Sequence, residues 1–326
     1  MPQLHHDDTA IVTRDLSRTY RSRGNKNLLT GLFRPEWRYT PAVQDLSFDI
    51  KRGEAVAFLG PNGAGKTTTM KMLSGLMHPS SGDVSVLGYT PFERKQEYLK
   101  RIGFVMGNKT GLNWDLTPTQ NFDLLQKIYD VPLADFNERL QRFVTMLKIE
   151  HVLDSQTRQL SLGERLKCEF AAALLHEPEV LFLDEPTIGL DIDSKAELRK
   201  FLRQLVDSHN ITMLLTSHDM DDIGQTCERA IIINHGQKLY DGSLKSLRQK
   251  YSDKKYVQLV FRSKPSAKVL AGIGTVTHQN SLTYHLVLES EQGMKNIARL
   301  LGDDELLDMQ IEAVPLEEII SNSFKQ

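Results

Sequence analysis

Short hydrophobic runs bounded by polar residues recur along the chain and predict strands that are buried on both faces. The segment 54–59 contains the run Ala-Val-Ala-Phe-Leu, and the segments 180–183 and 211–215 are similarly apolar. Continuous apolar strands of this length are typical of parallel sheets that helices cover on both sides. A helical pattern at 194–206 separates the last two runs, so we expect a parallel crossover between them.

A second set of strands shows alternation of apolar and polar residues. The sequence Leu-Ser-Phe-Asp-Ile at 46–50 predicts a half-exposed antiparallel strand. Further strands are expected at 11–16 and 82–87. Short strands at 230–233 and 237–240 close the core.

The segment 21–40, between the first two strands, holds five basic residues and one acidic residue. We expect a solvated loop there. Because the segment also carries aromatic residues, contact with a membrane face or a partner is the alternative.

Helical spacing predominates from 92 to 160. One helix is predicted to begin at Thr117 and Pro118, because proline suits the first turn of a helix. Another is expected at 133–147.

A polar, basic stretch at 245–255 separates a C-terminal region with a pattern of its own. Strands are predicted at 256–261, 282–288 and 306–312, and a helix at 292–301. A mixed unit of about 70 residues is marginally stable by itself. We therefore expect it to lean on the first domain.

The length of 326 residues suggests two domains. We expect an α/β domain at 1–245, with a helical subdomain at about 92–176, and a small accessory α+β domain at 246–326. A hydrophobic fraction of 40% with 25% charged residues is ordinary for a core-forming globular protein.

Charge and hydropathy argue against several functional classes. The 40 Lys and Arg residues balance 42 Asp and Glu residues, so no excess positive charge attracts nucleic acid. The longest apolar run, at 170–175, is far too short to cross a membrane. The N-terminus lacks the apolar segment of a signal peptide. We expect a cytosolic chain unless another protein holds it at a membrane.

Cysteine and histidine usage indicates no structural metal. Cys168 and Cys227 are too few and too far apart for a disulfide framework or a zinc site. We expect two packed thiols in a reducing cytosol.

The segment 60–67 reads Gly-Pro-Asn-Gly-Ala-Gly-Lys-Thr and fits the phosphate-loop pattern G-x-x-x-x-G-K-[ST]. A buried strand precedes it, and a helical pattern at 66–78 follows it. That order aims free backbone N–H groups and a positive helix end at one anion. Lys66 would hold the β- and γ-phosphates, and Thr67 would offer its hydroxyl to Mg²⁺. A glycine-rich turn without a ligand is the alternative, but the flanking strand and helix favour a site for a nucleoside triphosphate.

Two adjacent carboxylates, Asp184 and Glu185, follow the apolar run at 180–183. Where a strand ends, the backbone can turn both toward the crevice at the carboxyl edge of the sheet, where ligands bind. Asp184 would then help to hold Mg²⁺, and Glu185 would polarise the attacking water. Solvated acids at a strand end are the alternative.

Three further segments are candidates for the same site. Ser161 and Glu164 form an S-x-x-E capping box before an apolar-faced helix, and a capped helix start can also bind an anion. His218 follows the strand at 211–215, in line with Asp184 after its own strand. Tyr20, after the first strand, could stack on a purine. Taken alone, each residue also has an ordinary structural explanation.

Together these motifs resemble the ATP-binding cassette family, in particular the nucleotide-binding subunits of bacterial exporters of drugs and polysaccharides. The resemblance covers about residues 10–245 and depends on motifs in a fixed order. The motifs are the Walker A loop at 60–68, the signature at 160–164, the Walker B strand at 180–185, the D-loop at 189–191 and the switch histidine His218.

The resemblance implies a P-loop ATPase core with a mostly parallel sheet, an antiparallel β subdomain and a helical subdomain. It also implies roles for individual residues. Glu185 would be the catalytic base, His218 would contact the γ-phosphate, and Lys66 would assist. The implied nucleotide-binding residues are Tyr20, Gly60, Pro61, Asn62, Gly63, Ala64, Gly65, Lys66, Thr67, Thr68, Ser161, Gly163 and Glu164. Mg²⁺ would be held by Thr67, Asp184 and Asn108.

Two positions depart from the family pattern. Asn108 stands where the family has glutamine, and its side chain is one methylene shorter. The signature reads Ser-Leu-Gly-Glu instead of Ser-Gly-Gly-Gln, so Glu164 adds a negative charge unless it folds back as the capping-box partner. Slow or partner-dependent hydrolysis is therefore one expectation from these two departures.

The family resemblance predicts an ATPase subunit that powers export through a separate membrane permease, by ATP-driven closure of two cassettes. The partner would be a second cassette, as a homodimer, and the permease would dock on 92–160, near Trp114. The chain would lie on the cytoplasmic face of the inner membrane and bind no nucleic acid. A soluble cassette ATPase acting on nucleic acid or ribosomes is the alternative. A GTP switch is not supported, since 108–111 departs from Asn-Lys-x-Asp at its last residue.

Overall fold

The computed structural model describes residues 8–23, 37–107, 109–249, 254–288, 291–300, 305–313 and 316–323. The chain divides into two compact units between Asp241 and Gly242. Each unit is considered by itself below.

A six-stranded, mainly parallel sheet forms the centre of the first unit. In spatial order its strands are β5 (Ile102–Met106), β6 (Val180–Asp184), β7 (Thr212–Thr216), β3 (Ala55–Leu59), β8 (Arg229–Asn234) and β9 (Gln237–Ser243). Every residue of β3, β6 and β7 is buried, as continuous apolar runs require. The expected parallel crossover between β6 and β7 is confirmed, with Leu183 opposite Leu215.

A three-stranded antiparallel sheet lies beside this centre, in the order β2-β1-β4. Its strands are β1 (Thr9–Arg23), β2 (Trp37–Lys51) and β4 (Ser81–Val86). The prediction of a loop at 21–40 is wrong at both ends of the segment. These ends belong to β1 and β2, and Arg21 pairs with Tyr39. Exposed strand ends satisfy their backbone hydrogen bonds without apolar alternation, so no hydrophobic pattern marks a strand there. The middle of that segment, 24–36, is outside the described residues.

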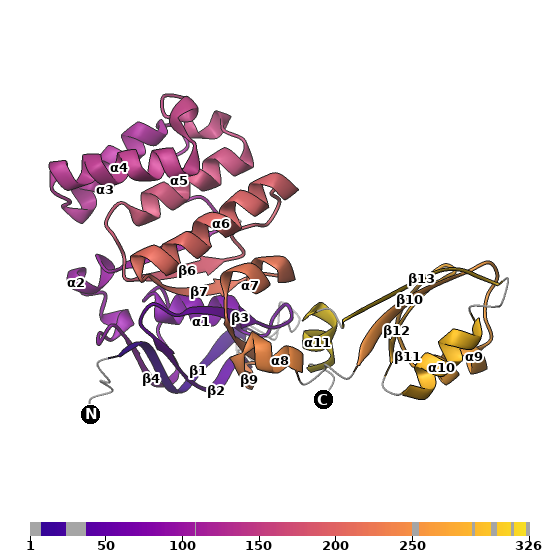
Figure 1. Cartoon of the computed structure of the whole chain (residues 1–326). Coiled ribbons are helices and arrows are strands. Elements are labelled where there is room, and N and C mark those ends of the chain that lie inside the picture. The colour runs from indigo at the N-terminus through magenta and orange to yellow at the C-terminus, as the bar shows by residue number, and fades with distance from the viewer. Residues whose placement is uncertain are drawn as a thin grey trace, which may run out of the picture. The chain divides into compact units, whose positions relative to one another are not determined.

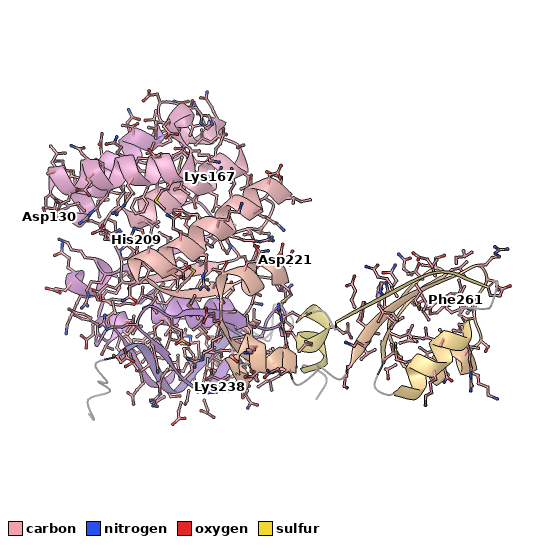
Figure 2. All side chains as sticks on the ribbon, in the orientation of Figure 1. Asp130, Lys167, His209, Asp221, Lys238 and Phe261 are labelled. Carbon is pink, nitrogen blue, oxygen red and sulfur yellow. The ribbon has the colours of Figure 1, made fainter. Side chains whose placement is uncertain are left out.

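Helices flank the two sheets, and Figure 1 shows α3, α4 and α5 together. The helices of the first unit are α1 (Lys66–Leu73), α2 (Gln96–Leu99), α3 (Pro118–Tyr129), α4 (Leu133–Leu147), α5 (Leu162–Leu174), α6 (Ile192–His209) and α7 (Met220–Thr226), with 3₁₀ turns at Pro91–Glu93, Glu150–Val152 and Thr157–Gln159. Capping boxes begin α3 at Thr117 and α5 at Ser161. Lys167 on α5, labelled in Figure 2, donates to Glu197 on α6 at 2.7 Å.

Two expectations for this region need correction. The stretch predicted as helical from 92 to 160 contains β5, which pairs with β6 at the edge of the sheet. Its five residues are too few to stand out against helical spacing on either side. Helix α1 ends at Leu73, earlier than the predicted 78, because Gly75 turns the chain with a φ of +76°.

Both cysteines are buried and unpaired, as expected. Burial raises the pKa of the Cys168 thiol to about 12.

The second unit contains a four-stranded antiparallel sheet in the order β11-β12-β10-β13. Its elements are α8 (Leu244–Gln249), β10 (Lys255–Phe261), α9 (Ala267–Ile273), β11 (Thr275–Asn280), β12 (Thr283–Leu288), α10 (Glu291–Leu300), β13 (Leu306–Ala313) and α11 (Leu316–Ser323). Helices α9 and α10 pack together (Figure 1), and Phe261, labelled in Figure 2, belongs to the core of this unit. The three predicted strands and the helix near 292–301 are confirmed. The patterns of α9 and β11 were missed, and part of the polar stretch at 245–255 forms α8.

Candidate nucleotide-binding site

The chain between β3 and α1 forms a tight loop over residues 60–65. Gly65 has a φ of +106°, and a Cβ atom there would lie 2.4 Å from the carbonyl oxygen of Ala42. Gly63 has a φ of +83°, another conformation that glycine adopts without strain. No described side chain caps the start of α1. Its first N–H groups are therefore available to an anion in the way the sequence pattern predicts.

Lys66 is the first residue of α1, and its side chain folds back over this loop. Its Nζ donates to the carbonyl oxygens of Gly60 at 2.6 Å and Pro61 at 3.3 Å. Burial lowers the pKa of the ammonium group, and the charges of Glu185 and Asp184 oppose that change. The loop thus holds a largely desolvated positive charge at its mouth.

Asp184 ends β6 and joins three elements. Its Oδ2 accepts a hydrogen bond from the hydroxyl of Thr67 at 2.9 Å, and its Oδ1 accepts one from the hydroxyl of Thr216 at 2.7 Å. Thr216 is the last residue of β7 and was not predicted as a site residue. No local signal marked this contact, because Thr216 and Asp184 are 32 positions apart along the chain.

Glu185 adopts a left-handed backbone conformation with a φ of +54°. Its N–H group donates to the carbonyl and hydroxyl oxygens of Thr216, both at 3.1 Å. This turn keeps Glu185 at the same edge of the sheet as Asp184, as the sequence argument required.

His218 lies directly against Glu185. Its Nε2 is 3.1 Å from Glu185 Oε1, and its backbone N–H donates to Oε2 at 3.2 Å. Burial raises the pKa of Glu185, while the charges of His218 and Lys66 lower it. The position of His218 therefore favours the ionised form of Glu185.

These residues share one cavity of about 490 Å³, which is within the range of small-molecule sites. Its lining consists of Tyr20, Ala42, Pro61, Asn62, Gly63, Gly65, Lys66, Thr67, Thr68, Asp184, Glu185, Ile188 and His218. The Tyr20 hydroxyl lies 3.1 Å from the hydroxyl of Thr68. Gly60 and Ala64, which the sequence also singled out, are not among the described residues that line the cavity. Ala64 is buried and its N–H donates to Pro61 at 3.1 Å.

The signature residues are elsewhere in the described chain. Ser161, Gly163 and Glu164 begin α5 and are not among the described residues that line the cavity. Glu164 Oε2 accepts from the N–H of Ser161 at 2.9 Å, and the Ser161 hydroxyl accepts from the N–H of Glu164 at 3.3 Å. The Ser161 hydroxyl also donates to Glu164 Oε2 at 2.7 Å, and this bond is the largest cause of the lowered pKa of Glu164, followed by the bond from the Ser161 N–H. Glu164 thus folds back onto its own helix.

Asn108 is outside the described residues, but its neighbour contacts the site. The N–H of Gly107 donates to the carbonyl oxygen of Asp184 at 3.0 Å. Nearby on α5, Glu169 is buried close to Thr110 and Gly111, and burial raises its pKa to about 7. An acid on the apolar face of a helix was the signal that would have identified Glu169 from the sequence.

The sequence of the chain was compared with protein families and with known proteins. Residues 43–188 match the model of the ABC transporter family. The ABC transporter ATP-binding protein NatA of Bacillus subtilis (strain 168) is 34% identical over 215 residues, which cover 66% of this chain and 87% of NatA. The chain belongs to the ABC transporter ATP-binding proteins.

Other matches agree with this assignment. The bacitracin transport ATP-binding protein BcrA of Bacillus licheniformis is 32% identical over 80% of this chain and 78% of its own length. A solved structure of an ATP-binding subunit of an ABC transporter has a TM-score of 0.62 and 26% identity, over 74% of this chain and 93% of that one. The predicted family and the P-loop fold class are therefore confirmed.

This ABC protein is an ATPase of a transporter complex, as the sequence predicted, and ATP is its nucleotide. Cassettes of this family dimerise and work with membrane permease components. Among the residues that the structure describes, no helix combines the length and the apolar character that crossing a membrane requires.

Proposed function

We propose that this ATPase energises export through a separate membrane permease, and that it does so when two identical cassettes close on ATP. The main support for this proposal is that the signature residues lie apart from the cavity that contains the phosphate loop. The cavity contains the phosphate loop, Glu185 and His218, whereas Ser161 and Gly163 lie outside its described lining. The start of α5 from a second copy can cover the open side of a γ-phosphate, and a head-to-tail pair forms two such sites.

In this proposal different cavity residues contact different parts of the nucleotide. Tyr20 stacks on adenine, and the loop N–H groups from Gly60 to Gly65 surround the phosphates together with Thr68. Lys66 exchanges its carbonyl partners for the β- and γ-phosphates, which are better partners for a buried ammonium group. Glu164 stays on its capping box, so its charge is directed away from the triphosphate.

The residues present fit a magnesium ion that arrives with the nucleotide. Mg²⁺ prefers oxygen ligands and is commonly bound by one or two carboxylates plus phosphates. The hydroxyl of Thr67 and the carboxylate of Asp184 already lie 2.9 Å apart. Within the described ranges, no cluster of three His, Cys, Asp or Glu side chains could bind a metal alone. The ion would neutralise phosphate charge. Asn108 is the third residue proposed to hold it, with Thr67 and Asp184.

Glu185 is the proposed general base. It takes a proton from the water that attacks the γ-phosphate, and its raised pKa makes it a better proton acceptor at neutral pH. The backbone N–H of His218 donates to one oxygen of this carboxylate, its Nε2 lies 3.1 Å from the other, and His218 lines the same cavity.

The proposal assigns an ATPase domain to 1–245 and an accessory domain to 246–326, and the division of the chain between Asp241 and Gly242 supports it. The permease would dock on the helical region at 92–160. There Trp114 is 49% exposed, and the Arg165 guanidinium carbon is 5.1 Å from its ring centre. Exposed aromatic residues are enriched at interfaces. Docking would hold the chain at the cytoplasmic face of the inner membrane, and no nucleic acid is needed.

Replacing the base separates binding from chemistry. We expect Glu185→Gln to bind ATP normally and to lose turnover by about 10²- to 10⁴-fold, the usual contribution of a general base. ATPase assays and calorimetric ATP titrations measure the two effects. Sedimentation should also show an ATP-dependent dimer of this variant. Unchanged turnover would reject the role of Glu185, and a variant that stays monomeric at saturating ATP would reject closure by the cassettes alone.

A further inference from the structure

Tyr20 lines the nucleotide cavity, and other side chains hold its ring in place. Its hydroxyl lies 3.1 Å from Thr68 Oγ1 and 3.4 Å from Met77 Sδ. The guanidinium carbon of Arg18 lies 5.4 Å from the centre of the ring. That distance is within the limit of about 6 Å for a cation–π interaction.

Arg18 is not among the described residues that line the cavity, although Tyr20 is. The two residues are two positions apart on β1, and the guanidinium group lies over the Tyr20 ring. We therefore expect Arg18 to influence a nucleotide through that ring.

The surroundings of Arg18 favour this arrangement. Its Nη1 donates to the carbonyl oxygen of His78 at 2.9 Å. Its Nε is buried and has no hydrogen-bond partner within the described chain. A buried donor without a partner is costly, and the electron-rich face of Tyr20 offsets part of that cost. The guanidinium group is thus fixed at both the His78 carbonyl and the ring.

We propose that Arg18 is a positioning residue for the nucleobase, which fixes the Tyr20 ring as a rigid platform on which the base stacks. The inference rests on the proposed stacking of adenine on Tyr20. A side chain that is already ordered loses less conformational entropy when a ligand binds. Arg18 should therefore affect the affinity for ATP and leave the affinity for a ligand without a base unchanged.

The test compares a non-hydrolysable ATP analogue with inorganic tripolyphosphate, both titrated calorimetrically into the full chain. We expect Arg18→Met to weaken binding of the ATP analogue by about three- to tenfold, the scale of a partly buried cation–π contact. Binding of tripolyphosphate should not change. Arg18→Lys keeps a cation over the ring and should restore most of the affinity for the analogue. In steady-state assays, KM for ATP should rise while kcat stays close to its original value.

Arg94 offers a matched control. Its Nη1 donates to the carbonyl oxygen of Gly75 at 3.2 Å, so it also fastens the chain that follows α1. Arg94 is not among the cavity-lining residues of the described chain. If Arg94→Met weakens the analogue as much as Arg18→Met does, the effect comes from the loop. If Arg18→Met weakens tripolyphosphate equally, Arg18 supports the fold alone. Either result would overturn the proposal.

Tyr20→Ala distinguishes this inference from the proposed function. If that variant binds both ligands as before, adenine does not stack on Tyr20 and the role of Arg18 fails with it, whereas the proposed closure of two cassettes on ATP does not depend on this result. If Tyr20→Ala weakens the analogue alone while Arg18→Met changes neither ligand, only the role of Arg18 is rejected.

Discussion

At the scale of single residues, Glu185 and His218 are coupled through the 3.1 Å contact between their side chains. Burial raises the pKa of Glu185, and the charge on His218 lowers it. A general base works only when it is deprotonated, so turnover should rise with pH through this raised pKa. His218→Ala removes the lowering charge, and the acid limb of the kcat profile should therefore move to higher pH. Turnover at neutral pH should fall about 10- to 100-fold.

A control variant is His278→Ala, on an exposed strand of the second unit. It should keep the pH profile of the original protein. An acid limb that stays in place in His218→Ala would show that His218 does not influence the ionisation of Glu185.

At the scale of secondary-structure elements, α5 contains a buried acid whose titration should affect stability. Burial raises the pKa of Glu169 from 4.5 to about 7. The folded state therefore binds more protons than the unfolded state between these values, and the free energy of unfolding falls as pH rises from about 4.5 to 7. Glu169→Gln removes this loss. The shift corresponds to at most about 3 kcal/mol, so we expect its Tm to exceed that of the original chain by roughly 5–10 °C at pH 8 and to match it near pH 4.5.

Thermal unfolding followed at both pH values tests this expectation. Glu138→Gln, at an exposed position on α4, is the control and should change Tm at neither pH. An equal gain for Glu169→Gln at both pH values would show that packing, and not ionisation, is responsible.

The elements that the sequence predicted well are those with local signals. Strands β3, β6 and β7 are continuous apolar runs, and α3 and α5 begin with capping boxes that involve residues three positions apart. Strand β5 was missed because its identity depends on pairing with β6, which lies far along the chain. The exposed ends of β1 and β2 have no apolar pattern, and only their mutual pairing makes them strands.

The same distinction applies to the candidate site. The phosphate loop and the carboxylates of Asp184 and Glu185 could be predicted because each is a short motif at the end of an apolar strand. Thr216 could not, because its importance comes from a hydrogen bond to Asp184, 32 positions away. Arg18 was missed for a similar reason, since its contact with Tyr20 is visible only once the side chains are placed.

At the scale of the whole molecule, the proposed site is divided between two chains, and mixing of inactive variants can test this. Lys66→Ala disables the cavity but keeps the start of α5. Ser161→Arg keeps the cavity but places a bulky side chain at the helix start. Each variant should be inactive alone. In a mixed dimer, one site combines the intact cavity of the second variant with the intact α5 of the first. Random pairing of equal amounts should therefore restore roughly a quarter of the original turnover, if the two sites act independently.

The matched control is a mixture of Lys66→Ala with Glu185→Gln. Lys66 and Glu185 line the same cavity of one chain, so both cavities of that mixed dimer are defective and no turnover should return. Ser161→Arg also removes a helix cap that is worth about 1 kcal/mol, and a thermal melt checks that the variant remains folded. If sedimentation shows mixed dimers and the first mixture stays inactive, Ser161 does not act across the interface. If both mixtures recover equally, the cavity of a single chain does not need its own Lys66 and Glu185 together. Recovery in the first mixture alone requires that one chain supplies the phosphate loop and the other supplies the α5 start that completes it.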